Sequence, residues 1–234
     1  MFKNKVLSLT IIAMTFTTVS AQTIQFENKE FEISNVKASV IDFEGHKVLK
    51  LERDLDKIPF DVNHLENTVD EATFMKLANT NIENGIIEFK VYSQIQNPSP
   101  FEFAQGFIGL AFNINKDNSA FESIYLRPKA ARSEQQFARN HSVQYYAYPD
   151  FKFEKLRQPE FKGQYETYAD SGLNEWISLR IELKNGQAIL YVNNQKYPSF
   201  IVSERKGKNK SGSIGLWVDI GTIAYFKNLK ITKY

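Results

Sequence analysis

The chain has 234 residues, of which 42% are apolar and 14% aromatic, with 29 lysines and arginines against 27 aspartates and glutamates. This length can bury one large core, and so many aromatic residues argue against an intrinsically disordered chain. The formal net charge of +2 argues against a strongly basic nucleic-acid-binding protein, so we predict no nucleic-acid partner. Without cysteine, the chain is neither a disulfide scaffold nor a lipoprotein anchored through a cysteine.

The first 21 residues have the pattern of a signal peptide. Two lysines in Met1–Lys5 precede an uncharged, mostly apolar run of 14 residues, Val6–Val19, and Ala21 supplies the small residue before a cleavage site. This run is shorter than the roughly 20 residues that span a bilayer, so a retained membrane anchor is the weaker alternative. We predict an exported protein, periplasmic or secreted, without membrane insertion. Its mature chain, residues 22–234, is predicted to be a single domain with 27 acidic and 27 basic residues (29 minus the two lysines).

Nine segments of the mature chain are rich in β-branched and aromatic residues or alternate between apolar and polar residues, which predicts β-strands. They are Val48–Leu51, Ile86–Tyr92, Phe107–Ile114, Ser123–Arg127, Ser142–Tyr148, Trp176–Lys184, Ala188–Val192, Ser213–Asp219 and Ala224–Thr232. From Ile177 to Leu183 every second residue is apolar, as in a half-buried antiparallel strand. Asn185-Gly186 then predicts a tight hairpin, because its turn needs positive φ at both central residues.

Few segments have a helical pattern. Asp70–Asn79 and Glu134–Asn140 are the two predicted helices, and residues 22–84 are otherwise predicted to hold an opening strand and loops. The lysine-rich stretch Arg205–Lys210 is predicted to be a solvated loop, since it has no interleaved aromatic residues. Many short antiparallel strands with few short helices predict an all-β fold, a two-sheet antiparallel jelly roll.

Several signatures of known chemistry are missing from the sequence. No CxxC, HExxH, GxSxG or phosphate-binding glycine loop occurs, and the three histidines have no metal-site spacing, so we predict no metal and no cofactor. A retaining glycosidase needs two carboxylates close together, which a strand supplies at positions i and i+2. Asp54 and Asp56 are the closest match, and they are predicted to lie in a loop beside Pro59.

The segment Phe121–Asp170 concentrates side chains suited to an acidic sugar. It holds arginines that bind carboxylate or sulfate, together with tyrosines and a histidine that stack or transfer protons. Alternation places Tyr125 and Arg127 on one face of their strand, and Gln144 and Tyr146 on one face of the next. If the opposite faces form the core, these four side chains line an exposed groove. The alternative is an ordinary surface rich in arginine and tyrosine.

Trp217 is a second candidate for binding sugar. In Ser213–Asp219, Ile214 and every second residue after it share one face, which leaves Trp217 on the other. There it would be an outward-facing platform on which a sugar ring stacks. The alternative is ordinary packing beneath a loop.

The C-terminal half contains NEWISLRIELKNGQAILYVNNQ and SGSIGLWVDIGTIAYFKNLKIT. Through these motifs, and across roughly residues 85–234, the chain resembles the concanavalin A-like lectin/glucanase superfamily, in particular the 3-keto-disaccharide hydrolase or family 16-like branch. The resemblance implies a concanavalin A-like jelly roll whose concave face binds carbohydrate, in a secreted protein of polysaccharide degradation. The chain lacks the paired acidic motif of family 16 hydrolases, which argues against simple retaining hydrolysis.

The stretch YLRPKAAR…RNHSVQYYAYPD carries another resemblance. It is similar to small secreted jelly-roll proteins of marine polysaccharide degradation, including the oligosaccharide dehydratase group that acts on ulvan fragments. This resemblance implies a carbon–oxygen lyase that eliminates water from an unsaturated uronic-acid residue at the end of an acidic oligosaccharide.

Elimination next to a carboxylate needs that carboxylate neutralised, a base for the proton and an acid for the leaving hydroxyl. We predict that Arg127 and Arg139 hold the carboxylate or a sulfate. His141 is the predicted base, and Tyr146 is the predicted acid or its partner. The other predicted substrate-binding residues, which orient the sugar, are Tyr125, Arg132, Asn140, Gln144 and Trp217.

Two alternatives to a dehydratase remain at this point. One is a non-catalytic carbohydrate-binding module on the same fold, in which His141 is expendable. The other is a glycoside or 3-keto-glycoside hydrolase, which requires a carboxylate in the groove. The candidate acids are Glu122, Asp150, Glu182 and Asp219.

Overall fold

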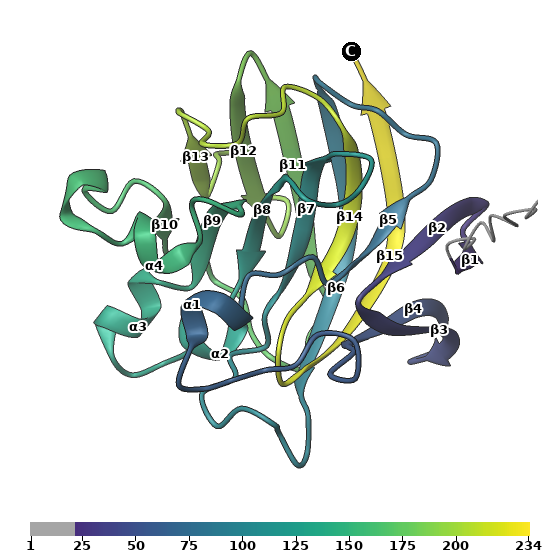
Figure 1. Ribbon diagram of the computed structural model, residues 1–234, viewed down its shortest axis with the longest axis horizontal. Helices are drawn as coiled ribbons and strands as arrows, with labels where there is room; N and C mark the ends of the chain where they lie inside the picture. Colours follow the sequence, from purple (N-terminus) through teal and green to yellow (C-terminus); the bar gives the residue numbers. More distant parts are fainter. Residues whose placement is uncertain (1–21) are drawn as a thin grey trace, which may run out of the picture.

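Two antiparallel β-sheets lie face to face in the computed structural model, which describes residues 22–234 (Figure 1). The predicted signal peptide, residues 1–21, lies outside the described residues. The first sheet has eight strands in the order β1 (Thr23–Phe26), β2 (Lys29–Ser34), β5 (Phe74–Leu77), β14 (Ser213–Val218), β7 (Ile108–Ile114), β8 (Phe121–Leu126), β9 (Val143–Tyr148) and β10 (Glu166–Thr167). The second has seven strands in the order β13 (Phe200–Val202), β12 (Gln187–Val192), β11 (Ile177–Lys184), β6 (Gly85–Ile95), β15 (Thr222–Lys233), β4 (His46–Arg53) and β3 (Val36–Phe43).

The helices are short and gather at one side of the first sheet, where β8, β9 and β10 end (Figure 1). They are α1 (Leu65–Thr68), α2 (Pro128–Ala131), α3 (Gln136–Asn140), α4 (Phe153–Leu156) and the 3₁₀ helix η1 (Pro159–Phe161). The predicted all-β fold, a two-sheet antiparallel jelly roll of the concanavalin A-like type with few short helices, is confirmed. None of the helices within residues 22–234 is long and apolar enough to cross a membrane.

Local sequence signals predicted most strands correctly. Each of the nine predicted segments overlaps a strand, and β11 alternates between buried and partly exposed residues along Ile177–Leu183. Asn185 and Gly186 have φ values of 52° and 80°, as the predicted hairpin between β11 and β12 requires. The predicted helix Glu134–Asn140 is confirmed as α3, and the stretch Arg205–Lys210 is a loop.

The predicted helix Asp70–Asn79 is wrong, because Phe74–Leu77 forms β5 between β2 and β14. All four residues of β5 are buried, including Lys76, whose ammonium donates to the Lys116 carbonyl. A strand covered on both sides lacks the alternation of buried and exposed residues by which a half-buried strand is recognised from its sequence. Residues 22–84 as a whole contain five strands, whereas we expected only Val48–Leu51 and an opening strand.

The main core lies between the two sheets and contains alternate residues of both. Leu110, Ile124 and Leu216 from the first sheet, and Ile181 and Phe226 from the second, are among its fully buried members. Burial of this apolar surface supplies most of the favourable free energy of folding.

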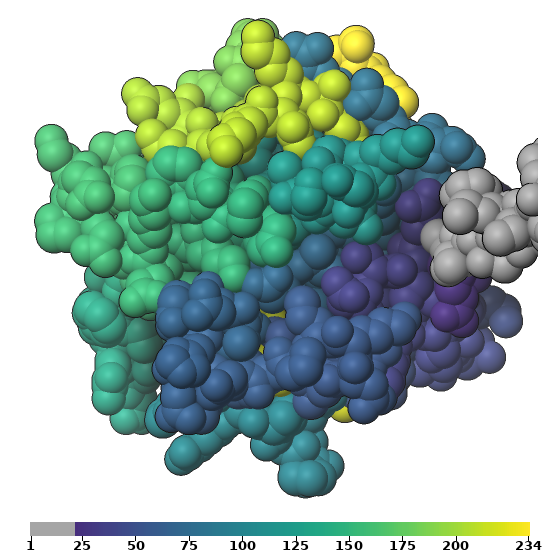
Figure 2. Space-filling view, in the orientation of Figure 1, coloured from purple at the N-terminus to yellow at the C-terminus, as the bar shows by residue number. Residues whose placement is uncertain are grey.

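The opposite face of the first sheet is also buried. We call it the covered face; in register across β5, β14, β7, β8 and β9 it carries Phe74, Trp217, Gly109, Tyr125 and Gln144. Segment 54–73, which contains α1 and follows β4, is spread over this side of the molecule (Figure 2, blue). The indole Nε1 of Trp217 donates a hydrogen bond of 2.9 Å to the Glu71 carbonyl, so the segment is tied to the face that it covers.

Segment 54–73 is anchored by a buried ion pair. Arg53 Nη1 lies 2.8 Å from Asp219 Oδ1, and the two side chains are only 1% and 3% exposed. The same guanidinium donates to the carbonyls of Ile58, Pro59 and Thr68, so the turns of the segment form around it. Beside this anchor a small apolar cluster of Val69, Phe101, Ala104 and Ile220 joins the segment to the loop before β7.

Gly109 allows the aromatic rings of the covered face to pack. It lies between Trp217 and Tyr125, whose ring centroids are 4.8 Å apart. A Cβ at this position would lie 2.2 Å from the Ile124 carbonyl oxygen and 2.6 Å from the Tyr125 Cα, so the β7–β8 pairing would have to shift. We expect Gly109→Ala to lower the free energy of unfolding by about 3 kcal/mol, measured by urea denaturation.

Gly163→Ala is the control. Its Cβ would meet no atom within 4 Å, and its φ of +68° adds backbone strain alone, for an expected cost of about 1 kcal/mol. If the two variants lost the same free energy of unfolding, close packing at Gly109 would not be what the covered face requires there.

Candidate functional site

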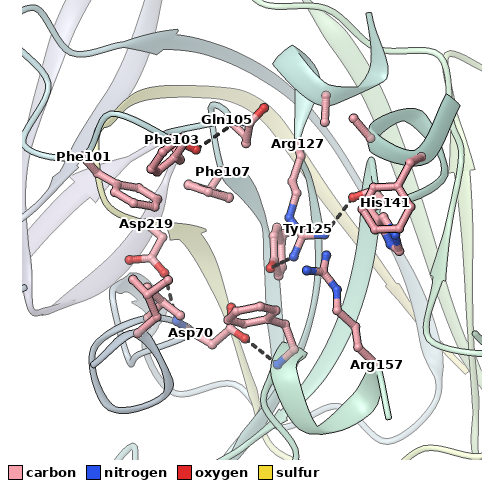
Figure 3. A pocket seen from close by; sticks show the side chains of 16 residues that line it. Asp70, Phe101, Phe103, Gln105, Phe107, Tyr125, Arg127, His141, Arg157 and Asp219 are labelled. Carbon is pink, nitrogen blue, oxygen red and sulfur yellow. Dashed lines mark hydrogen bonds between the residues drawn. The ribbon is translucent and has the colours of Figure 1, made fainter. Parts of the chain in front are cut away.

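A cavity of about 300 Å³ opens at one end of the covered face, where the central strands β14, β7, β8 and β9 meet their loops (Figure 3). Its apolar lining includes five phenylalanines: Phe101, Phe103, Phe107, Phe137 and Phe153. Its polar lining consists of Asp70, Gln105, Tyr125, Arg127, His141, Arg157 and Asp219. Apolar walls with a few convergent polar groups are typical of a small-molecule or sugar-residue site.

His141 and Glu166 form a pair at one side of the cavity. His141 lies just before β9, and Glu166 begins β10, which pairs with β9. This pairing brings the two side chains together, with His141 Nδ1 2.5 Å from Glu166 Oε2. An Nδ1–H that donates to this carboxylate leaves the lone pair of Nε2 free to accept a proton. The imidazole also packs edge-on against the Phe137 ring, at 4.5 Å between centroids, which fixes its orientation.

Glu166 also accepts hydrogen bonds from two arginines, Arg157 and Arg127. Arg157 donates to Glu166 Oε1 from Nε at 2.7 Å and from Nη2 at 2.6 Å, and Arg127 Nη1 donates to the same oxygen at 3.2 Å. Burial by itself raises the pKa of Glu166, but the hydrogen bonds and charge of Arg157 and the charge of Arg127 hold it below its usual range. This carboxylate therefore stays charged and keeps the histidine and both arginines in place.

Arg127 connects this pair to Tyr125. Its Nη1 donates to the His141 carbonyl at 2.7 Å, and its Nη2 donates to the Tyr125 hydroxyl at 2.6 Å. Burial raises the pKa of Tyr125 well above its ordinary value, outweighing the opposing charge of Arg127. The phenol therefore stays protonated near neutral pH and keeps one O–H to donate to a ligand.

Two carboxylates line the other side of the cavity. Asp219 accepts hydrogen bonds from Arg53 (2.8 Å), from the Ile220 N–H (2.7 Å) and from the Asp70 N–H (2.9 Å). The Asp70 carboxylate accepts one from the Phe153 N–H at 2.8 Å. Burial raises the pKa of Asp70 to about 7; Asp219 contributes to the increase, and the Phe153 N–H, Arg127 and Lys152 oppose it.

The site therefore has two electrostatically different sides. Arg127 and Arg157 outnumber Glu166 on the side of His141, which favours an anionic group there. On the side of Asp70, the charge of Asp219 is balanced by Arg53. Within residues 22–234, no three His, Asp or Glu side chains are grouped in a way that could hold a metal ion.

The structure brings three of the predicted site residues to the cavity, namely Tyr125, Arg127 and His141. The expectation that Tyr125, Arg127, Gln144 and Tyr146 lie on an exposed face is wrong, since all four are buried. Segment 54–73 covers part of that face at Trp217, and residues 153–166 contact Arg127 and Gln144. The alternation within one strand does not show whether distant segments cover its polar face.

Tyr146 and Trp217 lie beneath the site rather than in it. The ring of Tyr146 packs against Phe121, Tyr125 and Trp217, and its hydroxyl has no hydrogen-bond partner among the described residues. Trp217 is fully buried, so the outward-facing platform predicted for it is wrong and the alternative of ordinary packing holds. Gln144 is also beneath the site, where its side-chain amide donates to the Tyr165 carbonyl.

The remaining predicted binding residues do not line the cavity. Arg139 donates to the Tyr168 hydroxyl at 2.9 Å, and Arg132 pairs with Asp170 and Glu175 on the surface. Asn140 accepts a hydrogen bond from Gln136 within α3. Of the four acids considered for hydrolysis, Asp219 lines the cavity; Glu122, Asp150 and Glu182 do not.

Sequence analysis missed Asp70, Arg157, Glu166 and the phenylalanine lining as site residues. Arg157 and Glu166 belong to the segment that we singled out, but no local pattern marks Glu166 as the partner of His141. Asp70 lay in the predicted helix, and its contact with Asp219 joins residues 149 positions apart.

No protein-family model and no curated protein matches the sequence. Solved structures share the fold. The carbohydrate-binding module CBM66 from Bacillus subtilis aligns with a TM-score of 0.51 at 12% identity, over 85% of this chain and 96% of that chain. The GH43 protein BlXynB from Bacillus licheniformis aligns with a TM-score of 0.50 at 10% identity, over 92% of this chain and 38% of that chain. At these identities the likeness concerns the fold alone.

Glu166→Gln tests whether this carboxylate organises the site. We expect a loss of about 2 kcal/mol in the free energy of unfolding at neutral pH, because two arginines and a histidine lose a charged partner. The folded-state pKa of Glu166 is below the usual 4.5, so its stabilisation is present above about pH 4.5 and is lost as the pH falls through the folded value. The difference from wild type should therefore shrink in acid, measured by urea denaturation across pH.

Glu160→Gln, an exposed residue of η1, is the control and should change stability little at any pH. A Glu166→Gln variant as stable as this control at neutral pH would contradict the organising role.

Proposed function

We propose that the cavity binds the end of an acidic oligosaccharide and eliminates water from its uronic-acid residue. The observation that carries the proposal is the convergence of the His141–Glu166 pair and the Tyr125–Arg127 pair on one cavity. The fold is shared with a carbohydrate-binding module and with a GH43 protein, which supports a carbohydrate-active protein. Geometry and charge support the finer assignment to an acidic sugar.

The polar and the apolar residues that line the cavity would bind different parts of the sugar. Arg157 binds Glu166 through Nε and Nη2, which leaves Nη1 as a donor for a second carboxylate. The phenylalanine side chains contact the apolar faces of a sugar ring, and the cavity volume of about 300 Å³ suits one residue of an oligosaccharide.

The proposed elimination breaks one C–H and one C–O bond. His141 Nε2 accepts the proton, the C–H electron pair becomes the new C=C bond, and the neighbouring hydroxyl leaves with a proton from an acid as one molecule of water. Charge that develops on the sugar carboxylate is stabilised by Arg127, Arg157 and the Tyr125 O–H. Tyr125, and not the buried Tyr146, is the tyrosine that lines the cavity, and here it stabilises charge rather than supplying the proton predicted from Tyr146.

Export of the protein and a single domain over residues 22–234 remain part of the proposal. The support for export is the signal-peptide pattern of residues 1–21. N-terminal sequencing of the exported protein should find Gln22 as its first residue.

Sugar binding without chemistry is the second candidate function. Phe103 and Phe137 line the cavity and are 62% and 75% exposed, so they form an aromatic rim that can hold further sugar residues. The shared fold of the CBM66 module agrees with this candidate. Binding with no chemical change in any substrate of this class would favour it.

His141→Ala tests the elimination. The substrates are oligosaccharides with a terminal unsaturated uronate, made from ulvan with a polysaccharide lyase; mass spectrometry detects the loss of one water, and ultraviolet absorbance follows the uronate. We expect wild-type protein to remove one water and His141→Ala to be at least about a hundredfold slower, the scale of one general base.

His46→Ala, an exposed residue at the start of β4 in the other sheet, is the control and should keep the wild-type rate. Full turnover by His141→Ala would refute the base assignment. Cleavage to smaller sugars by wild-type protein would indicate a hydrolase and direct attention to Asp219.

The rim generates a separate prediction about affinity. Phe103→Ser and Phe137→Ser should each weaken the binding of oligosaccharides about fivefold, the equivalent of about 1 kcal/mol per lost aromatic contact. Monosaccharide affinity should change less, because the rim lies outside the cavity's polar centre. Tyr197→Ser is the control, an aromatic residue that is 72% exposed elsewhere, and calorimetric titration is the measurement. Unchanged affinities in both rim variants would contradict this role.

A further inference from the structure

We propose that Asp70 is the catalytic acid of the site, a buried carboxylic acid at the cavity lining that gives its proton to the leaving hydroxyl. This inference rests on the proposed elimination, in which His141 is the base and Tyr125 stabilises charge, so that the leaving hydroxyl needs a separate proton donor. Neither the sequence patterns nor the shared fold indicates Asp70.

The backbone holds Asp70 in an uncommon conformation. Its φ is +56°, in the left-handed region that residues other than glycine adopt infrequently. The Asp70 N–H donates to Asp219 Oδ2 at 2.9 Å, and that carboxylate is itself fixed by Arg53 and the Ile220 N–H. The turn is therefore determined by a buried anchor, and it directs the Asp70 side chain to the cavity lining.

The Asp70 side chain has little to keep it charged. Oδ2 accepts one hydrogen bond, from the Phe153 N–H, and among the described residues Oδ1 has no hydrogen-bond partner and no lysine or arginine forms an ion pair with the carboxylate. The residue is only 1% exposed. A buried carboxylate without a cation costs several kcal/mol unless it takes up a proton.

The charged and titratable groups around Asp70 come from several elements. They are Asp219 directly after β14, Tyr125 in β8 and Arg127 directly after it, Tyr146 in β9, and Lys152 before α4. Arg53, at the end of β4, acts indirectly through its ion pair with Asp219. Asp219 contacts Asp70 directly, because it accepts a hydrogen bond from the Asp70 N–H. The negative charge of Asp219 opposes ionisation of the Asp70 carboxyl.

The two aspartates of the cavity have different environments. Asp219 pairs with the buried Arg53 and accepts hydrogen bonds from two backbone N–H groups, whereas the Asp70 carboxyl has no cation partner and burial raises its pKa to about 7. Unequal environments of two carboxyl groups in one cavity are a common arrangement around a catalytic acid.

Asp70 and His141 divide the proton transfers between them. In the view of Figure 3 they lie on opposite sides of Tyr125 and Arg127. His141 Nε2 takes the proton from carbon, and Asp70 gives its proton to the hydroxyl, so that the C–O bond breaks and water leaves. After the step His141 is cationic and Asp70 anionic, and a proton passed from one to the other through water restores both.

Asp70→Asn tests this inference, since an amide keeps the acceptor for the Phe153 N–H but has no proton to transfer. We expect kcat to fall at least about a hundredfold. Wild-type activity should also decline above about pH 7 as Asp70 loses its proton, and this alkaline decline should be absent from the residual activity of the variant. Asp42→Asn, on the exposed surface of β3, is the control.

Stability gives a readout that needs no substrate. The folded-state pKa of Asp70, about 7, is above the ordinary 3.8, so the folded protein binds an extra proton between these values. The resulting stabilisation is complete below about pH 3.8 and is lost as the pH rises from there through 7. Asp70→Asn removes this dependence, and its melting temperature should equal or exceed that of wild type above pH 7. A variant whose melting temperature changes with pH as the wild type's does would refute a protonated Asp70.

The outcomes separate the two proposals. Full activity of Asp70→Asn beside an active wild type would overturn Asp70 as the acid and leave the elimination standing. A wild-type protein that removes no water would overturn both the elimination and the catalytic role, whereas the pH dependence of stability would still decide whether Asp70 is a neutral acid.

Discussion

The buried pair of Arg53 and Asp219 is the contact on which the candidate site depends. A buried ion pair gains stability only when its remaining donors and acceptors are also satisfied. Here Arg53 reaches three carbonyls of segment 54–73, and Asp219 accepts two backbone N–H groups. One polar cluster thus fixes the path of a segment whose only regular secondary structure is a short helix.

The path of segment 54–73 decides what kind of site the fold can have. An uncovered sheet face would present Trp217, Tyr125 and Tyr146 as an open groove with stacking platforms. With the segment in place these rings form a second apolar layer, and the space left for a ligand is at the ends of the central strands. The chemistry therefore concentrates on residues just after or before strands, such as Arg127, His141 and Asp219.

Features set by neighbours in the sequence were predictable, and features set by distant contacts were not. The alternation in β11 and the Asn185-Gly186 turn depend on local geometry, so the sequence identified them. It also singled out Arg127 and His141, because their residue types suit an acidic ligand. Burial of Tyr125 depends on a segment more than fifty positions away, and the position of Asp70 depends on Asp219, 149 positions away. No periodic pattern encodes either contact.

Arg127 joins the two sides of the site into one electrostatic unit. It hydrogen-bonds Glu166, the His141 carbonyl and the Tyr125 hydroxyl, while its charge also lowers the pKa of Asp70 against the effect of burial. Because Arg127 is buried and its partners surround it, binding of an anion nearby changes the electric field at the proposed base, His141, and at the proposed acid, Asp70, together. An anionic substrate beside Arg127 and Arg157 offsets their positive charge and so favours the protonated form of Asp70. The ligand that the site is built to hold would thereby help to keep a proton on the group proposed to give it up.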